Sequence, residues 1–264
     1  SMVFPGHAVD TSASTGGSSG LMTLQSCGAT DTVTYEFTAS EPGTYTYYSG
    51  TQTELQIEMG LVGTIIVRPT PEDQAYNDPG TQFDHETLFL LSSMDPAIHA
   101  FAEQGKINQI DLTNRWPVYW FINGRAAPDD LVGPGVAWLP HQPYNSSPRM
   151  TPGQKLLVRI VGADQDQHPL HLHGNHYREI ARYGRMLKTE GGGMGSRQKF
   201  TTLSVPGQTV DAIFEWTGKD MGWDIYGGLD VPEMAHDCTD VLDNETGLPA
   251  TTGDYVPGDG YADA

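Results

Sequence analysis

Three histidines, His168, His171 and His173, stand within the stretch HPLHLHG at residues 168–174. Side chains alternate between the two faces of an extended strand. The spacing therefore predicts that His171 and His173 share one face and that His168 points to the other. Imidazole nitrogens are ligands for copper, zinc, iron and nickel. The stretch is thus predicted to offer metal ligands at two separate positions.

The elements that position these histidines are predicted to be mainly β-strands. Only 18% of the residues are charged, and the chain contains 31 glycines and 18 prolines. Long stretches are rich in Thr, Val and Tyr, which favour strands over helices. Patterning and turn signals predict strands at residues 32–37, 45–48, 61–67, 86–91, 120–124, 155–161 and 209–216. One short helix is predicted at residues 95–104, with Asp95 as its cap and Pro96 in its first turn.

Two segments of the chain are similar to each other. Residues 32–50 (TVTYEFTASEPGTYTYYSG) parallel residues 209–228 (TVDAIFEWTGKDMGWDIYGG). In both segments an aromatic residue, a glycine, a second aromatic residue, a tyrosine and a second glycine follow in the same order. An internal repeat of this kind favours two copies of one fold.

The stretch at residues 168–174 resembles the HPxHLHG motif of the multicopper oxidases. Residues 44–67 are similar to that family's YHSH…Q…GLxGxxIV segment, and residues 120–129 are similar to the xxINGRxxPD segment that opens a later domain. The resemblance extends from residue 1 to about residue 228. It implies an all-β fold of two cupredoxin-like Greek-key β-barrel domains, the first of them truncated.

The resemblance and the composition together predict four segments. These are a partial cupredoxin-like domain at residues 1–69, a linker at residues 70–83, a cupredoxin-like domain with the HPLHLHG motif at residues 84–228, and an acidic irregular C-terminal tail at residues 229–264. The opening residues, SMVF, are already typical of a strand, so we expect the chain to be a piece of a longer protein.

The resemblance also implies roles for the three histidines. In multicopper oxidases the first histidine of the motif serves the type 1 copper, and the second and third serve the type 2 and type 3 coppers. His168, His171 and His173 are therefore the expected metal ligands, and copper is the expected metal.

Most of the family's other copper ligands are replaced in this chain. The replaced positions, motif by motif, are Val3 and Pro5, then Tyr48 and Gly50, and finally Tyr226, Gly227, Gly228 and Pro232. Only His171 and His173 remain for the trinuclear cluster, and Gly227 stands at the position of the type 1 cysteine. Since Val, Pro and Gly cannot bind a metal through their side chains, we expect at most one copper ion and no complete four-copper site.

Two interpretations of the histidines stay open. They could hold one copper ion, with His176 as a further candidate, because a stable site needs three or four ligands. Alternatively, they form a relic cluster held by hydrogen bonds to the backbone and to Tyr48 or Tyr226. A zinc hydrolase is disfavoured, because no glutamate stands near the histidines to act as a base.

Two functional hypotheses follow. In the first, the chain is a module of a larger extracellular copper oxidase, and other domains or subunits of that protein are its partners. If it is active, it would take part in one-electron oxidation of a metal ion or small reductant, with oxygen as the acceptor. In the second, it is a non-catalytic structural or assembly module of an extracellular protein or polymer.

The net charge and the hydropathy of the chain argue against some classes of binding partner. The formal net charge of −19 argues against binding to nucleic acid, because the chain has no basic patch to neutralise phosphates. No apolar run approaches the ~20 residues needed to span a bilayer. Composition and family resemblance indicate an extracellular or periplasmic location. Cys27 and Cys238 either pair with each other or with cysteines elsewhere.

Overall fold

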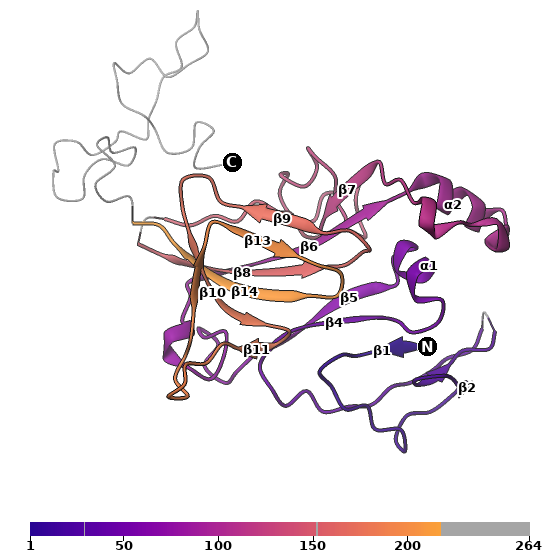
Figure 1. Ribbon diagram of the computed structural model, residues 1–264, viewed down its shortest axis with the longest axis horizontal. Helices are drawn as coiled ribbons and strands as arrows, with labels where there is room; N and C mark the ends of the chain where they lie inside the picture. Colours follow the sequence, from indigo (N-terminus) through magenta and orange to yellow (C-terminus); the bar gives the residue numbers. More distant parts are fainter. Residues whose placement is uncertain (29, 152, 218–264) are drawn as a thin grey trace, which may run out of the picture. The chain divides into compact units, whose positions relative to one another are not determined.

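The computed structural model describes residues 1–28, 30–151 and 153–217 (Figure 1). Strands predominate in these residues, and the all-β class is confirmed. Apart from Glu215 at the end of the last strand, the elements lie in one compact unit formed by Ser1–Pro148 and Lys155–Phe214. The predicted acidic tail, Tyr226 to Gly228, Pro232 and Cys238 fall outside the described residues. The predicted boundaries of the domains stay predictions.

The first sheet has three antiparallel strands in the order β1-β4-β5. Their bounds are β1 (Met2–Val3), β4 (Gly43–Ser49) and β5 (Val62–Val67). The helix α1 (Thr53–Glu58) connects β4 to β5. A separate small hairpin is formed by β2 (Ser18–Ser19) and β3 (Leu24–Gln25). The strands predicted at residues 45–48 and 61–67 are thus confirmed.

The strand predicted at residues 32–37 is wrong as a regular strand. This segment forms only isolated bridges, through Thr34 and Phe37. The reason lies in the facing segment, where the carboxylate of Asp10 accepts hydrogen bonds from the backbone of residues 12 and 13 and folds them into a turn. A ladder cannot continue across that turn, although the alternation of residues 32–37 suits a strand.

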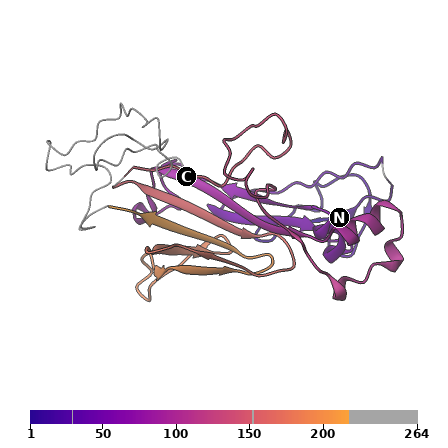
Figure 2. The same ribbon diagram turned by 90° about the horizontal axis from the view of Figure 1, so that it is seen from above.

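The second sheet has the order β11-β10-β14-β8-β6-β7, with β12 also paired to β10. This order can be followed in Figure 2, from the magenta strand β6 to the orange strands β14 and β10. The bounds are β6 (His85–Met94), β7 (Tyr119–Ile122), β8 (Lys155–Gly162), β10 (Tyr177–Arg182), β11 (Arg185–Met186), β12 (Arg197–Lys199) and β14 (Thr209–Glu215). β6 and β8 run parallel, and β8 is central and almost entirely buried.

The HPLHLHG stretch lies in a small two-stranded sheet of its own. It begins as β9 (His168–His171), which pairs antiparallel with β13 (Thr201–Ser204). In Figure 1 these two strands lie on the opposite side of β8 and β14 from β1 and β4.

Helices in the described residues are short. The predicted helix is confirmed as α2 (Pro96–Glu103), and the Asp95 side chain accepts a hydrogen bond from Ala97 N, as an N-cap does. Three 3₁₀-helices, η1 (Pro79–Thr81), η2 (Ile107–Gln109) and η3 (Leu112–Asn114), complete the set. None of the helices in the described ranges has the length and apolar character to cross a bilayer.

The predicted linker at residues 70–83 contributes to the core. Ala75 and Tyr76 are buried, and they pack in one cluster with Leu157 of β8 and Ile180 of β10. The segment therefore joins the two sheets while its middle anchors the second one, which a composition rich in Pro, Asp and Gly does not reveal.

Buried polar side chains tie β4 to β8 and β14. The Thr44 hydroxyl donates to Asp211 Oδ1 at 2.6 Å, and the Tyr76 hydroxyl donates to Asp211 Oδ2 at 2.5 Å. Arg159 Nη1 donates to Thr44 Oγ1 at 2.8 Å and lies 3.3 Å from Asp211 Oδ2. Burial and the neighbouring Asp211 charge raise the pKa of Tyr76, so its phenol stays protonated and can donate. This network fixes the first sheet against the second.

Candidate metal centre

His168, at the start of β9, is fixed by a carboxylate. Its Nε2 lies 2.8 Å from Asp164 Oδ1, and the Asp164 side chain is buried. Because a carboxylate only accepts hydrogen bonds, His168 Nε2 is the donor in this contact, and Nδ1 is the ring nitrogen that the contact leaves unused. The ring of Trp120 packs edge-on against His168, with the ring centroids 5.6 Å apart.

Asp164 is itself part of a buried network that the sequence did not point to. Its second oxygen accepts a short hydrogen bond from Ser93, and Arg115 donates to Ser93 Oγ at 2.8 Å. Arg115 also pairs with Glu58 at 2.6 Å. The only signal in the sequence is that Asp164 stands four residues before His168. The network holds the His168 ring against the turn that follows β8.

His171 and His173 lie together, as their spacing predicted. Their ring centroids are 5.2 Å apart, and both side chains are exposed. His171 Nδ1 lies 2.7 Å from the hydroxyl of Thr201, its register partner on β13. That contact orients the ring and leaves His171 Nε2 free. The structure does not bring this pair to His168, whose ring is held on the Asp164 side.

His176, the further candidate, lies beyond Phe200. The rings of His171 and His176 both meet the Phe200 ring edge-on, with centroids at 5.8 Å and 5.6 Å. Within residues 1–28, 30–151 and 153–217, no three His, Cys, Asp or Glu side chains gather as a metal site. The donors that the structure describes therefore do not fit a complete copper centre of any type.

The positions that replace the family's other ligands are packed in a different way. Val3 pairs with Tyr48 across β1 and β4. A Cβ atom built on Gly50 would lie 2.8 Å from Val3 Cγ2 and 2.9 Å from Ser1 Oγ. The space that a histidine at residue 50 would need is thus partly filled by Val3, which replaces a ligand in the first motif, and by Ser1.

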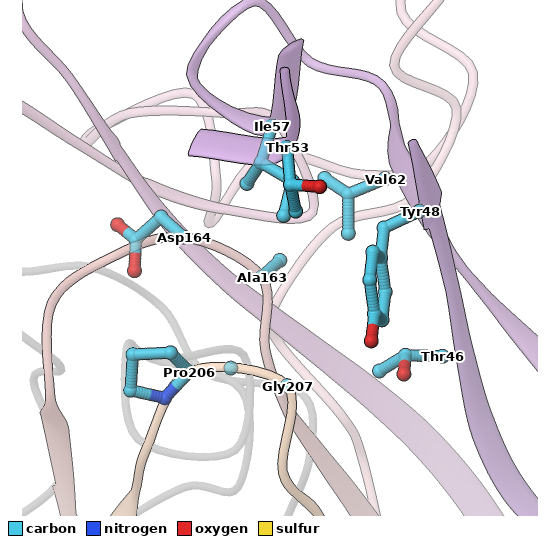
Figure 3. Close-up of a pocket in the computed structure, with 10 residues that line it drawn as sticks. Thr46, Tyr48, Thr53, Ile57, Val62, Ala163, Asp164, Pro206 and Gly207 are labelled. Atoms are coloured by element: carbon cyan, nitrogen blue, oxygen red, sulfur yellow. The ribbon is translucent and has the colours of Figure 1, made fainter. Parts of the chain in front are cut away.

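Tyr48 lines a cavity of about 200 Å³ instead of a metal centre. Figure 3 shows its ring along one wall, with Ala163 and Gly207 opposite and Ile57 and Val62 above. The proposed hydrogen bond from Tyr48 to the histidine cluster is not present, because β4 and β9 lie apart (Figure 1). Its predicted counterpart Tyr226 lies outside the described residues. Cys27 is exposed.

A family model described as multicopper oxidase matches residues 2–72. The match covers 71 of the chain's 264 residues. The match spans β1 to β5, which carry Val3, Tyr48 and Gly50, and it confirms the predicted resemblance. No curated protein sequence matches the chain.

Solved structures of multicopper oxidases share the fold. The multicopper oxidase mgLAC aligns over 75% of this chain and 53% of its own length, with a TM-score of 0.55 and 20% identity. The blue copper oxidase from Nitrosomonas europaea aligns over 71% of this chain and 50% of its own, with a TM-score of 0.52 and 19% identity. The copper nitrite reductase from Nitrosomonas europaea aligns over 82% and 64%, with a TM-score of 0.51 and 16% identity. The predicted cupredoxin-like fold is thus confirmed, and the chain spans about half the length of the first two structures.

Proposed function

We propose that this chain is a cupredoxin module of a larger multicopper-oxidase-like protein, and that it binds at most one copper ion. The observation that carries this proposal is the pair of adjacent imidazoles, His171 and His173, in a chain that contains multicopper oxidase sequence. Neutral imidazoles this close together suit a shared cation.

His171 and His173 supply two ligands, and His168 is the third candidate. His168 Nε2 is hydrogen-bonded to Asp164, so only His168 Nδ1 is available to a metal. Two or three imidazoles on separate faces do not complete a stable site, and the remaining ligands have to come from beyond the described residues, including another domain or subunit. We therefore assign no oxidase reaction to this chain by itself.

The second candidate is a structural or assembly module without copper. The position of Val3 and Ser1 beside Gly50 favours it, because their side chains occupy the space that a ligating side chain at residue 50 would need. In this case the His171–Thr201 hydrogen bond joins β9 to β13 and has no further role. For either candidate, we propose an extracellular or periplasmic location and other domains of the larger protein as partners.

Copper titration with electron paramagnetic resonance tests where the ion binds. We expect one Cu²⁺ signal with couplings to imidazole nitrogens, and we expect His171→Ala and His173→Ala each to remove it. The matched control is His141→Ala, because His141 is an exposed histidine in another loop. Binding that survives both substitutions would contradict the assignment, and no binding in the wild type would leave the structural module as the function.

A further inference from the structure

The hairpin turn between β10 and β11 carries an unusual residue. Arg182 pairs with Arg185, which leaves Tyr183 and Gly184 as a two-residue loop with φ angles of 53° and 69°. Positive φ at both positions defines a type I′ turn, which prefers Asn or Asp before Gly. A tyrosine is disfavoured there, because its Cβ crowds the backbone. Departures of this kind from local preference are concentrated at functional sites.

The ring of Tyr183 is exposed and yet fixed. The residue is 54% exposed. Its hydroxyl accepts a hydrogen bond from Gln208 Nε2 at 3.1 Å, and its backbone N–H donates to Thr209 O at 2.9 Å. Because Gln208 is buried, these contacts hold the ring in one orientation at the surface. A rigid aromatic surface of this kind binds a ligand with little loss of side-chain entropy.

Tyr183 lines a cavity of about 870 Å³, together with the start of β4 and residues 76–77. Tyr45 and Tyr76 form part of its wall. Their hydroxyls already have partners inside the protein, at Gly184 O and at Asp211. These two residues therefore contribute mainly ring surface to the cavity. The volume suits a ligand of one or two rings.

Two cations, Arg185 and Lys188, line the same cavity. Neither makes an ion pair in the part of the chain that the structure describes. The chain has 14 Lys and Arg residues against 33 Asp and Glu residues, so two unpaired cations in one cavity stand out from the acidic surroundings. An arginine fork binds carboxylates, as it binds phosphates, through two parallel hydrogen bonds.

Glu41 and Asn77 also line the cavity. A carboxylate such as Glu41 opposes the binding of an anion unless it accepts hydrogen bonds from the ligand. Ligand hydroxyls would supply those bonds, and the Asn77 amide both donates to and accepts from hydroxyls. The residues that line the cavity therefore suit a ligand with a carboxylate at one side and several hydroxyls at the other.

We propose that this cavity binds an acidic sugar unit, a uronate. Its carboxylate pairs with Arg185 and Lys188, and its hydroxyls bond to Glu41 and Asn77. One C–H face of the sugar packs on the Tyr183 ring, whose face carries partial negative charge. An aromatic carboxylate fits less well, because it would leave Glu41 without hydroxyl partners. This site is separate from the histidines and does not depend on copper.

Binding of D-glucuronate, D-glucose and benzoate to the full chain tests the ligand class, by saturation-transfer NMR and calorimetry. We expect glucuronate to bind in the millimolar range, and glucose and benzoate to bind at least about fivefold more weakly. Tighter binding of benzoate than of glucuronate, or no binding of glucuronate, would overturn the proposal.

Variants separate binding from folding. Tyr183→Asn supplies the residue that the turn prefers, so we expect an unchanged or higher melting temperature together with at least about fivefold weaker glucuronate binding. Arg185→Gln and Lys188→Gln should each weaken glucuronate about two- to fivefold and leave glucose unchanged, whereas Lys106→Gln, the charge-matched control, should affect neither. Wild-type affinity of Tyr183→Asn for glucuronate would rule out the site.

Discussion

Glu86 shows how a single side chain links this fold to pH. Burial raises the pKa of its carboxyl, but hydrogen bonds and charges from Arg68 and Arg159 outweigh burial and hold that pKa below its ordinary value. Arg159 is fully buried and donates to Glu86 Oε1 at 2.6 Å. A carboxyl whose pKa is lowered by folding stabilises the protein above its unfolded pKa of ~4.3. That stabilisation is lost as the pH falls through the lowered folded-state pKa.

We predict that Glu86→Gln lowers the free energy of unfolding by about 1–3 kcal/mol near neutral pH, because Arg159 loses a charged acceptor. The difference from wild type should shrink as the pH falls through the lowered pKa of Glu86, where this carboxyl itself becomes protonated. Urea unfolding at several pH values measures this. Glu72→Gln, at an exposed position, is the control and should have little effect. A penalty that does not change with pH would contradict the assigned role of the Glu86 charge.

At the scale of elements, two threonines on neighbouring strands allow a matched test of how β4 is tied to β14. Thr44 on β4 donates to Asp211 and accepts from Arg159, whereas the buried hydroxyl of Thr64 on β5 has no partner in the described structure. We predict that Thr44→Val costs about 1–3 kcal/mol of unfolding free energy, because both buried partners lose a bond.

Thr64→Val is the control for the same change of shape. Valine removes a buried hydroxyl that makes no hydrogen bond, so the substitution should be neutral or stabilising. Denaturant unfolding of both variants gives the comparison. If both variants lost the same amount of unfolding free energy, the polar network would not hold the first sheet to the second.

The turn of the β10–β11 hairpin allows a test of how backbone strain affects the stability of the protein. Asparagine tolerates a positive φ with less strain than tyrosine does. Tyr183→Asn should therefore raise the free energy of unfolding by about 1 kcal/mol. Tyr144→Asn removes another exposed tyrosine, at a position without a positive φ, and should bring no gain. Thermal and urea unfolding measure both variants. A loss of stability in Tyr183→Asn would show that the ring contributes more to the fold than its backbone strain costs.

Elements with strong local signals were predictable from the sequence. The Asp95-Pro96 pair marks the start of α2, and the apolar run of residues 155–161 marks β8. The pattern of residues 32–37 is equally regular, but a strand also needs a straight partner, and Asp10 bends that partner. Pairing over long distances in the sequence depends on both segments, so alternation in one of them cannot establish it.

At the scale of the whole molecule, the candidate site was partly predictable. Alternation along a strand is a local rule, and it correctly placed the His171 ring beside His173 and away from His168. The carboxylate that fixes His168 was not predictable, because Asp164 reaches it through the turn that follows β8. The contact of Val3 with Gly50 likewise depends on how β1 lies beside β4.

The family match and the site lead to different expectations for the molecule as a whole. Residues 2–72 match a multicopper oxidase family model, and the fold resembles that of longer copper proteins. The positions that resemble that family's copper ligands are nevertheless mostly occupied by other residues, and among the described ones Val3 pairs with Tyr48 across β1 and β4. We therefore propose that this chain keeps a cupredoxin-like fold and holds at most one copper ion.

Metal content per chain tests this inference most directly. The purified protein is loaded with excess copper, freed of unbound ions, and examined by elemental analysis together with its absorption spectrum. We predict no more than one copper per chain and no intense thiolate-to-copper band near about 600 nm. Two or more tightly bound copper ions per chain, or such a band, would contradict it.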